Sequence, residues 1–308
     1  MVEAASRGDR AAVARLISLV EHGDAPAREI GRLVYPLGGH AYTVGMTGAP
    51  GGGKSTLSDR LIERARAAGG EIAVLAVDPS SPFTGGAILG DRVRMQGHAT
   101  DPGVFIRSMA SRGHLGGLAL AVPEAIRVLD AAGFPWVVLE TVGVGQVEVE
   151  VAGAADTTVV VVNPGWGDAV QANKAGLLEV ADVLVINKAD RPGVEETERD
   201  LVAMLDMSNL SGWRPPIVRT IASTGEGTDD LWDAISGHRA YLEGNGMLRE
   251  RRSRRVAEEV ERIVARRLEH RARQLCSGAA YERLHRDVLE RRLDPYTAAG
   301  EIAAAGES

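Results

Sequence analysis

The segment GAPGGGKS, residues 48–55, constrains the fold more than any other feature of this sequence. It matches the pattern G-x-x-x-x-G-K-[S/T], in which backbone N–H groups turn inward and form a nest for anions. A short apolar run at residues 42–46 precedes it, and a helical pattern at residues 54–68 follows it. This order places the positive end of a helix behind the nest. The segment therefore predicts a phosphate-binding loop within an α/β fold.

The chain then repeats this alternation of short apolar runs and helical patterns. Further apolar runs lie at residues 72–77, 104–106, 136–139, 157–162, 183–186 and 217–220, and helical patterns at residues 118–132 and 195–205. Strands that are apolar on both faces indicate a parallel sheet with helices on both sides. We therefore expect a doubly wound, mostly parallel α/β sheet of the P-loop NTPase type, with ligands at the carboxyl ends of the strands.

Helical patterns flank the predicted sheet at both ends of the chain. Residues 2–37 read as helices, and no strand pattern occurs after about residue 229. The later part has one apolar stripe, formed by Val256, Val260, Ile263, Val264 and Leu268, and an opposite face rich in Arg and Glu. That face is either a nucleic-acid or membrane patch, or the solvated side of a packing or dimerisation helix. Interleaved Glu and missing aromatic residues favour the second interpretation.

These patterns predict three parts: an N-terminal helical segment at 1–38, a P-loop domain at 39–240 and a C-terminal helical extension at 241–308. The net charge of −7 argues against a dedicated nucleic-acid-binding protein. A single cysteine, Cys276, fits a reducing compartment. No apolar stretch is long enough to span a bilayer, and the first residues lack the apolar core of a signal peptide. We expect a cytoplasmic protein that binds neither nucleic acid nor membranes.

The loop and the start of the following helix supply the candidate phosphate ligands. Lys54 can reach the β- and γ-phosphates of a nucleotide, and the Ser55 hydroxyl can ligate Mg²⁺. The other candidates for nucleotide binding in this stretch are Gly48, Ala49, Pro50, Gly51, Gly52, Gly53 and Thr56.

The sequence Asn187-Lys188-Ala189-Asp190 follows the apolar run at 183–186 and indicates which base is bound. A carboxylate at Asp190 can accept hydrogen bonds from N1–H and the exocyclic amine of guanine. Adenine has an acceptor at N1 and would leave this carboxylate unpaired, which is strongly disfavoured. The cofactor is therefore expected to be GTP or GDP with Mg²⁺. The segment Ile221-Ala222-Ser223 ends the next run, and its backbone N–H near Ala222 is a weaker candidate donor to guanine O6.

Two acidic residues end apolar runs where the γ-phosphate and Mg²⁺ should lie. Glu140 ends the run at 136–139, with Gly143 placed to donate its N–H to the γ-phosphate. Glu replaces the more usual Asp there, which favours contact with the metal through water over direct contact. Asp78 ends the run at 72–77, where the strand end faces the nucleotide, which favours a functional residue over a helix or turn cap. Asp91 lies in the Gly- and Pro-rich segment that follows.

The residue that positions the attacking water is left open by the sequence. Some P-loop GTPases have a Gln directly after the strand-end glycine. Here Val144 takes that position and Gln146 comes later. Hydrolysis by the isolated protein should therefore be slow, with Asp78, Gln146 or a partner residue as candidates.

Three longer segments carry a resemblance to a known family: VDPSSPFTGGAILGDRVRM at 77–95, ETVGVGQVEVEVA at 140–152 and NPGWGDAVQANKAGLLEVAD at 163–182. They resemble the methylmalonyl-CoA mutase-associated GTPases, the MeaB/ArgK group of the SIMIBI class, over nearly the whole chain. The resemblance implies a GTPase chaperone of an adenosylcobalamin-dependent acyl-CoA mutase, which gates cofactor loading, protects the mutase and dimerises through its C-terminal helices.

The same resemblance implies three switch segments, at 83–95, 141–150 and 165–176. In the third, Gln171 and Lys174 are candidates for relaying contact with the mutase, or else they belong to an ordinary amphipathic helix start. Asp78, Asp91 and Glu140 match the Mg²⁺-site acids of the group. Ile221 stands where the group commonly has Ser, which puts a minor hydrogen bond to the nucleotide in doubt.

Other functions fit the residues less well. A metallochaperone GTPase of the nickel-insertion type would need thiolate or imidazole ligands near the switches, whereas Cys276 lies in the tail and His98 and His114 look isolated. A kinase for a protein substrate, or an inactive scaffold, finds little support. The sequence does not choose among methylmalonyl-, isobutyryl-, ethylmalonyl- and hydroxyisobutyryl-CoA mutases as partner.

Overall fold

The computed structural model describes residues 1–22, 24–48, 50–78, 96–98, 100–110, 117–141, 153–165, 180–208 and 212–305. The chain divides into two compact units, Met1–Arg252 and Ser253–Ser308. The predicted boundaries at residues 38 and 240 stay a prediction. Among the described residues no helix is long and apolar enough to cross a membrane.

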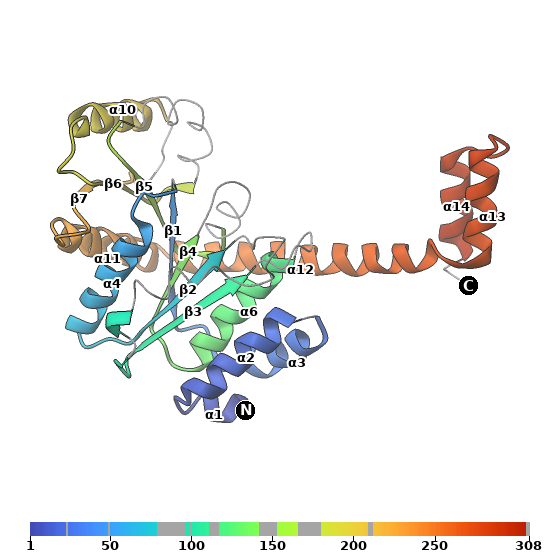
Figure 1. The fold of residues 1–308 in the computed structure, drawn as a ribbon, viewed down its shortest axis with the longest axis horizontal. Helices are drawn as coiled ribbons and strands as arrows, with labels where there is room; N and C mark the ends of the chain where they lie inside the picture. Colours follow the sequence, from blue (N-terminus) through green and yellow to red (C-terminus); the bar gives the residue numbers. More distant parts are fainter. Residues whose placement is uncertain are drawn as a thin grey trace. The chain divides into compact units, whose positions relative to one another are not determined.

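The first unit is built on a sheet of seven described strands in the order β3-β2-β4-β1-β5-β6-β7, and every described pair is parallel (Figure 1). The strands are β1 (Tyr42–Gly48), β2 (Ile72–Asp78), β3 (Val104–Ala110), β4 (Trp136–Thr141), β5 (Thr157–Val162), β6 (Val183–Asn187) and β7 (Ile217–Thr220). Each contains one of the seven apolar runs. The expected doubly wound parallel fold is confirmed.

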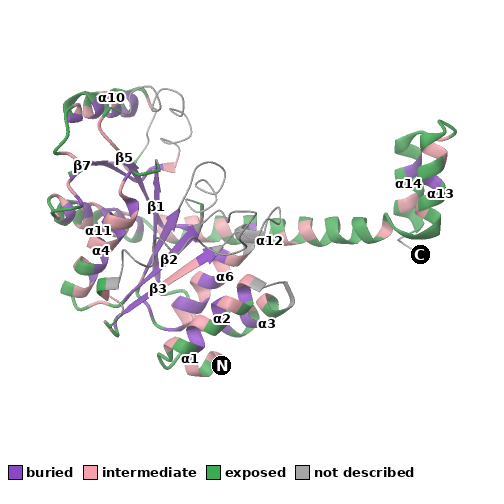
Figure 2. Cartoon of the chain, viewed as in Figure 1, coloured by how far each residue is buried: buried purple, intermediate pink, exposed green. Residues whose placement is uncertain are grey.

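Helices cover both faces of this sheet (Figures 1 and 2). They are α1 (Val2–Ala5), α2 (Arg10–His22), α3 (Asp24–Val34), α4 (Lys54–Ala67), α6 (Gly117–Ala131), α10 (Val194–Met207) and α11 (Thr228–Gly244), with short 3-10 turns η1 (Tyr35–Leu37) and η2 (Gln96–His98). Because neighbouring strand residues point to opposite faces, Leu75 packs with α2 and α6 while Val74 packs with α4 and α11.

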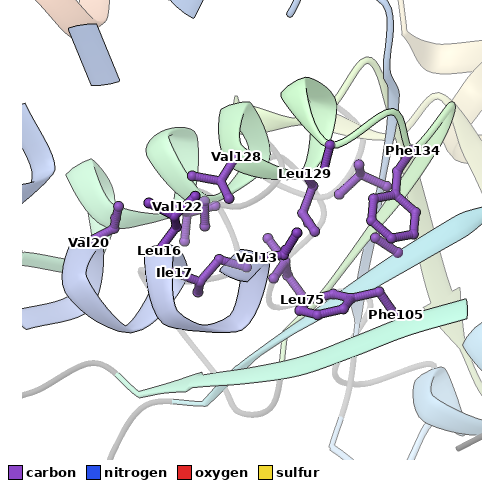
Figure 3. Packing of buried hydrophobic residues seen from close by; sticks show 14 of the residues in the cluster. Val13, Leu16, Ile17, Val20, Leu75, Phe105, Val122, Val128, Leu129 and Phe134 are labelled. Atoms are coloured by element: carbon purple, nitrogen blue, oxygen red, sulfur yellow. The ribbon is translucent and has the colours of Figure 1, made fainter. Parts of the chain in front are cut away.

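In two of the core regions, the apolar residues of the predicted helices pack against those of the predicted strands. Figure 3 shows Val13 and Ile17 of α2 and Leu129 of α6 meeting Leu75 of β2. On the other face, Leu61 of α4 is 1% exposed and packs in the cluster that contains the β1 side chains. Burying a side chain of this size stabilises the fold by roughly 1.5–3 kcal/mol. The loop before α4 is therefore held between two firmly packed elements.

A polar network lies where β5 and β6 begin. Two arginines near the start of α12 (Met247–Leu275) form ion pairs there, Arg251 with Asp182 at 2.8 Å and Arg252 with Asp156 at 2.6 Å. His238 of α11 is fully buried beside Asp182, with Nε2 and Oδ1 3.3 Å apart. This network joins α11 and the start of α12 to the amino ends of β5 and β6, whereas the phosphate-binding loop follows the carboxyl end of β1.

The second unit is helical. It contains the later part of α12, followed by α13 (Gly278–Leu289) and α14 (Pro295–Ala305). Asp294 caps α14, because its Oδ1 accepts hydrogen bonds from the N–H groups of Tyr296 and Thr297 at 2.9 and 3.0 Å. The apolar stripe expected on α12 is exposed within the described chain, with Val260 at 54% and Leu268 at 62%.

Candidate nucleotide-binding site

The phosphate-binding loop joins the end of β1, between β4 and β5, to the first residue of α4 (Figure 1). Two of its glycines are required by close contacts as well as by their positive φ angles of 126° for Gly48 and 91° for Gly53. A Cβ on Gly48 would lie 2.1 Å from the Val161 carbonyl oxygen, and one on Gly53 would lie 2.2 Å from Nδ2 of Asn187. The loop can therefore pack against β5 and β6 only with glycine at these positions.

Lys54 is the first residue of α4 and is only 6% exposed. Its Nζ donates a hydrogen bond to the carbonyl oxygen of Gly48 at 2.5 Å. The ammonium group thus lies across the loop, beside the backbone that would surround a phosphate chain. The positive end of α4 adds to the potential at this point.

Ser55 and Glu140 meet at the carboxyl ends of β1 and β4. Met46 and Glu140 are register partners in these adjacent strands, and the Ser55 hydroxyl donates to Oε1 of Glu140. Glu140 is 1% exposed. A hydroxyl and a carboxylate are oxygen ligands of the kind that Mg²⁺ prefers, so the chemistry of this pair fits the predicted metal site.

The two other predicted metal ligands are less fully described. Asp78 ends β2, and the preceding residues Ala76 and Val77 pair with Glu140 and Thr141 of β4. Its backbone therefore ends beside the Glu140 strand, although its side chain is not described. Asp91 lies outside the described residues.

Asn187, at the end of β6, connects the phosphate loop to the segment after β7. Its Nδ2 donates to the Gly52 carbonyl at 2.7 Å, and its Oδ1 accepts from the Ala222 N–H at 3.1 Å. Thr220 also donates to Oδ1 through its hydroxyl, at 3.1 Å. Because the Ala222 N–H already makes this bond, its predicted contact with guanine O6 would have to share or replace it.

The remaining base-side residues follow β6 directly. Lys188 adopts a left-handed conformation, with φ 60°, and its Nζ donates to the Gly51 carbonyl at 2.6 Å. The Ala189 N–H donates to the Thr220 carbonyl at 3.0 Å, which fixes the 187–190 segment against β7. Asp190 is exposed, so its carboxylate is accessible to a ligand.

The structure describes some of the remaining predicted site residues but not others. Ile221 and Ser223 lie in the described turn after β7, and Pro50, Gly51 and Thr56 lie in the described loop and helix. The predictions for Ala49, Gly143, Gln146, Gln171 and Lys174 fall outside the described residues, as do most of the switch segments at 83–95, 141–150 and 165–176.

One sequence interpretation needs correction. His98 is not isolated: its Nε2 lies 2.9 Å from Oδ1 of Asp59, and Glu63 is close to both. These three side chains have ligand atoms within 4.8 Å of one another. However, the Glu63 carboxylate already accepts two hydrogen bonds from Arg60. A cation there would compete with a guanidinium, so the grouping does not favour the metallochaperone alternative.

A glycine-rich loop at the carboxyl end of a central parallel strand, with a buried lysine at the start of the next helix, defines the class of P-loop nucleotide-binding proteins. Comparison with known families narrows this class. The sequence model of the family described as "Methylmalonyl Co-A mutase-associated GTPase MeaB" matches residues 13–276, and the chain belongs to this family. The resemblance carried by the sequence motifs is thereby confirmed, and the chain is a GTPase.

Individual relatives agree with this assignment. A Pyrococcus abyssi protein named as a GTPase is 52% identical over 306 residues, covering 98% of this chain and 94% of the relative. GTPase ArgK of Escherichia coli is 37% identical, covering 82% of this chain and 79% of its own. A solved structure described as an LAO/AO transport system kinase has a TM-score of 0.75 and 26% identity, covering 100% of this chain and 96% of that one.

Proposed function

We propose that this GTPase is a chaperone of an adenosylcobalamin-dependent acyl-CoA mutase of the methylmalonyl-CoA mutase type. In this role GTP binding and hydrolysis gate cofactor loading and protect the mutase. The observation that carries the proposal is the match of residues 13–276 to a family described as mutase-associated. A mouse relative, 33% identical over 268 residues, is named "Methylmalonic aciduria type A homolog, mitochondrial".

The phosphate side of the site supports guanine nucleotide binding and hydrolysis in the following way. Lys54, with the loop N–H groups and the N-terminus of α4, would hold the β- and γ-phosphates. Ser55 and Glu140 would hold Mg²⁺, together with Asp78 and Asp91. The bound ion neutralises charge on the phosphate oxygens. Because Glu140 is buried, its carboxylate is fixed toward the start of α4.

The base side would select guanine through Asp190, whose exposed carboxylate accepts from N1–H and the exocyclic amine. Asn187 would keep this part of the site at a fixed distance from the phosphates, because its side chain bonds both Gly52 and Ala222. The residue that positions water is Asp78 or Gln146, or belongs to the partner, and Lys174 would relay contact with the mutase to the nucleotide.

The second unit supports a homodimer in which the apolar stripe of α12 packs against a second copy. The four valine and leucine side chains of this stripe are 39–62% exposed at helical spacing: Val256, Val260, Val264 and Leu268. Removing such a stripe from water favours helix association.

We propose that the protein is cytoplasmic. Its proposed partners are a mutase and a second copy of itself, and we propose that it binds neither nucleic acid nor membranes.

The test is GTP turnover by the purified protein alone and with each of the four acyl-CoA mutases, together with gel filtration of each mixture. We expect slow turnover alone and an increase of at least about tenfold with one mutase, since a partner can complete a hydrolytic site in trans. The same mutase should co-elute in a nucleotide-dependent manner. The Lys54→Ala variant is the control for contaminating GTPase activity. Unchanged turnover and absence of co-elution with all four mutases would contradict the proposal.

A further inference from the structure

Arg60 links the helix of the phosphate loop to the segment after β7. It lies on α4, the helix that begins with Lys54. Its Nε donates to the carbonyl oxygen of Ala222 at 2.9 Å, and its Nη2 donates to the carbonyl oxygen of Ser223 at 3.0 Å. One side chain therefore holds two consecutive carbonyl groups of the 221–223 segment.

The guanidinium of Arg60 is itself held in orientation. Its Nη1 donates to both carboxylate oxygens of Glu63, at 2.9 and 2.8 Å. The Arg60 side chain is 25% exposed, which reduces screening of these contacts by water. The three guanidinium nitrogens, which lie in one plane, thus donate to two carbonyl groups and one carboxylate. A lysine ammonium cannot reproduce this geometry.

The segment that Arg60 contacts is held by several hydrogen bonds and is linked through Asn187 to Gly52 of the phosphate loop. It folds into a turn in which Thr224 and Gly225 both donate their N–H groups to the Ile221 carbonyl, at 3.0 and 2.9 Å. Ala222 is 4% exposed, with its N–H bonded to Asn187 and its carbonyl bonded to Arg60. The backbone of Ala222 is therefore fixed from β6 on one side and from α4 on the other.

We propose that Arg60 is a positioning residue for guanine recognition. By tying the 221–223 segment to α4, it sets the distance between the base-binding segment and the phosphate-binding loop. A nucleotide whose base and phosphates match that distance then binds without a shift of the 221–223 segment relative to the phosphate loop. This inference rests on the proposed function, in which residues 187–190 and 221–223 form the guanine site.

The test compares Arg60→Met and Arg60→Lys with a matched control, Arg64→Met. Arg64 lies on the same helix but pairs with Asp229 of α11 at 2.7 Å, away from the 221–223 segment. Calorimetry gives the dissociation constants of GDP and ADP with Mg²⁺, and steady-state assays give KM and kcat for GTP. Thermal unfolding checks that each variant is folded.

We expect Arg60→Met to raise the dissociation constant of GDP and the KM of GTP about tenfold, with a smaller change in kcat, as loss of one positioning interaction would give. The affinity for ADP, which depends on the phosphates, should change by less than about twofold. Arg60→Lys should resemble Arg60→Met, and Arg64→Met should bind GDP like the original protein. Unchanged GDP affinity in Arg60→Met, or equal losses for GDP and ADP, would overturn the assignment. If the original protein itself did not prefer GDP to ADP, the proposed guanine site would fail instead.

Discussion

Asp156 accepts two hydrogen bonds from the guanidinium of Arg252, at 3.2 and 2.6 Å, although the two residues are 96 positions apart. Asp156 is 1% exposed and lies just before β5, whereas Arg252 lies near the start of α12. Arg252 also donates to the carbonyls of Gly39 and Ala41, at 3.0 and 2.7 Å. These contacts hold the first residues of α12 against the beginnings of the central strands β1 and β5.

Breaking this pair should destabilise the first unit. Replacing Arg252 with Met removes the guanidinium that donates to the buried Asp156 carboxylate. We expect the free energy of unfolding to fall by about 3 kcal/mol, at the lower end of values for breaking buried ion pairs because Arg252 is 28% exposed. Denaturant unfolding measures it. The control is Arg273→Met. The pair that this variant loses, with Glu269, is well exposed, so the free energy of unfolding should fall by less than about 0.5 kcal/mol. Equal stability of the two variants would refute this role of Arg252.

The buried His238 predicts a loss of stability in mild acid. Burial lowers the pKa of His238 to about 4, against the opposing effect of Asp182 and with Arg251 adding to the decrease. The unfolded chain therefore takes up this proton at higher pH than the folded protein. The contribution of neutral His238 is complete above pH 6.5 and is lost as pH falls toward 4.

The measurement is urea unfolding of the original protein and of His238→Gln at pH 7 and at pH 5. Between pH 7 and pH 5 the free energy of unfolding of the original protein should fall by about 2 kcal/mol more than that of the variant. The reason is that each pH unit over which only the unfolded imidazole is charged lowers this free energy by about 1.4 kcal/mol. Comparing the two proteins cancels the titration of other groups. Parallel losses in both would show that His238 does not titrate on unfolding.

Lys54→Ala should abolish nucleotide-dependent function. The ammonium lies across the phosphate loop, so its removal leaves phosphate charge without compensation. We expect GTP turnover to fall at least about 100-fold, as is typical when a charge-stabilising donor is removed. Phosphate release reports the turnover, and circular dichroism reports folding. Turnover like that of the original protein would exclude this lysine from the reaction.

Asp190→Asn should change which base is preferred. An amide at this position can donate to the C2 oxygen of xanthine, which replaces the exocyclic amine of guanine. We expect affinity for GDP to fall and affinity for xanthosine diphosphate to rise, measured by competition with a fluorescent nucleotide. Glu196→Gln, an exposed acid-to-amide change on α10, serves as the control. A GDP preference that persists undiminished would mean that Asp190 does not read the base.

The parallel sheet could be predicted because it depends on local patterns. The run at 157–162 became β5 without change, and the helical pattern at 118–132 became α6 at Gly117–Ala131. The run at 104–106 was extended to Ala110, since the polar Arg107 and Ser108 gave no apolar signal but continue the pairing with β2. The phosphate loop was predictable because its spacing is nearly unique to one kind of turn.

Contacts between distant segments could not be predicted in the same way. Arg251 and Arg252 belong to an Arg- and Glu-rich stretch that looks solvated throughout, yet both pair with carboxylates in the first unit. The contact of Arg60 with the 221–223 segment gives no signal, because its partners there are carbonyl groups, which every residue has. Likewise, the pattern at residues 187–190 gave no sign that the Asn187 side chain bonds the phosphate loop to the segment after β7, and its predicted contact with the nucleotide stays a prediction.

The most direct test of the central claim is calorimetric titration of the purified protein with GDP and with ADP in the presence of Mg²⁺. The account predicts one binding site per chain and an affinity for GDP at least about 100-fold greater than for ADP, because adenine leaves the Asp190 carboxylate unpaired. No binding of GDP by folded protein, or equal affinity for the two nucleotides, would contradict the account.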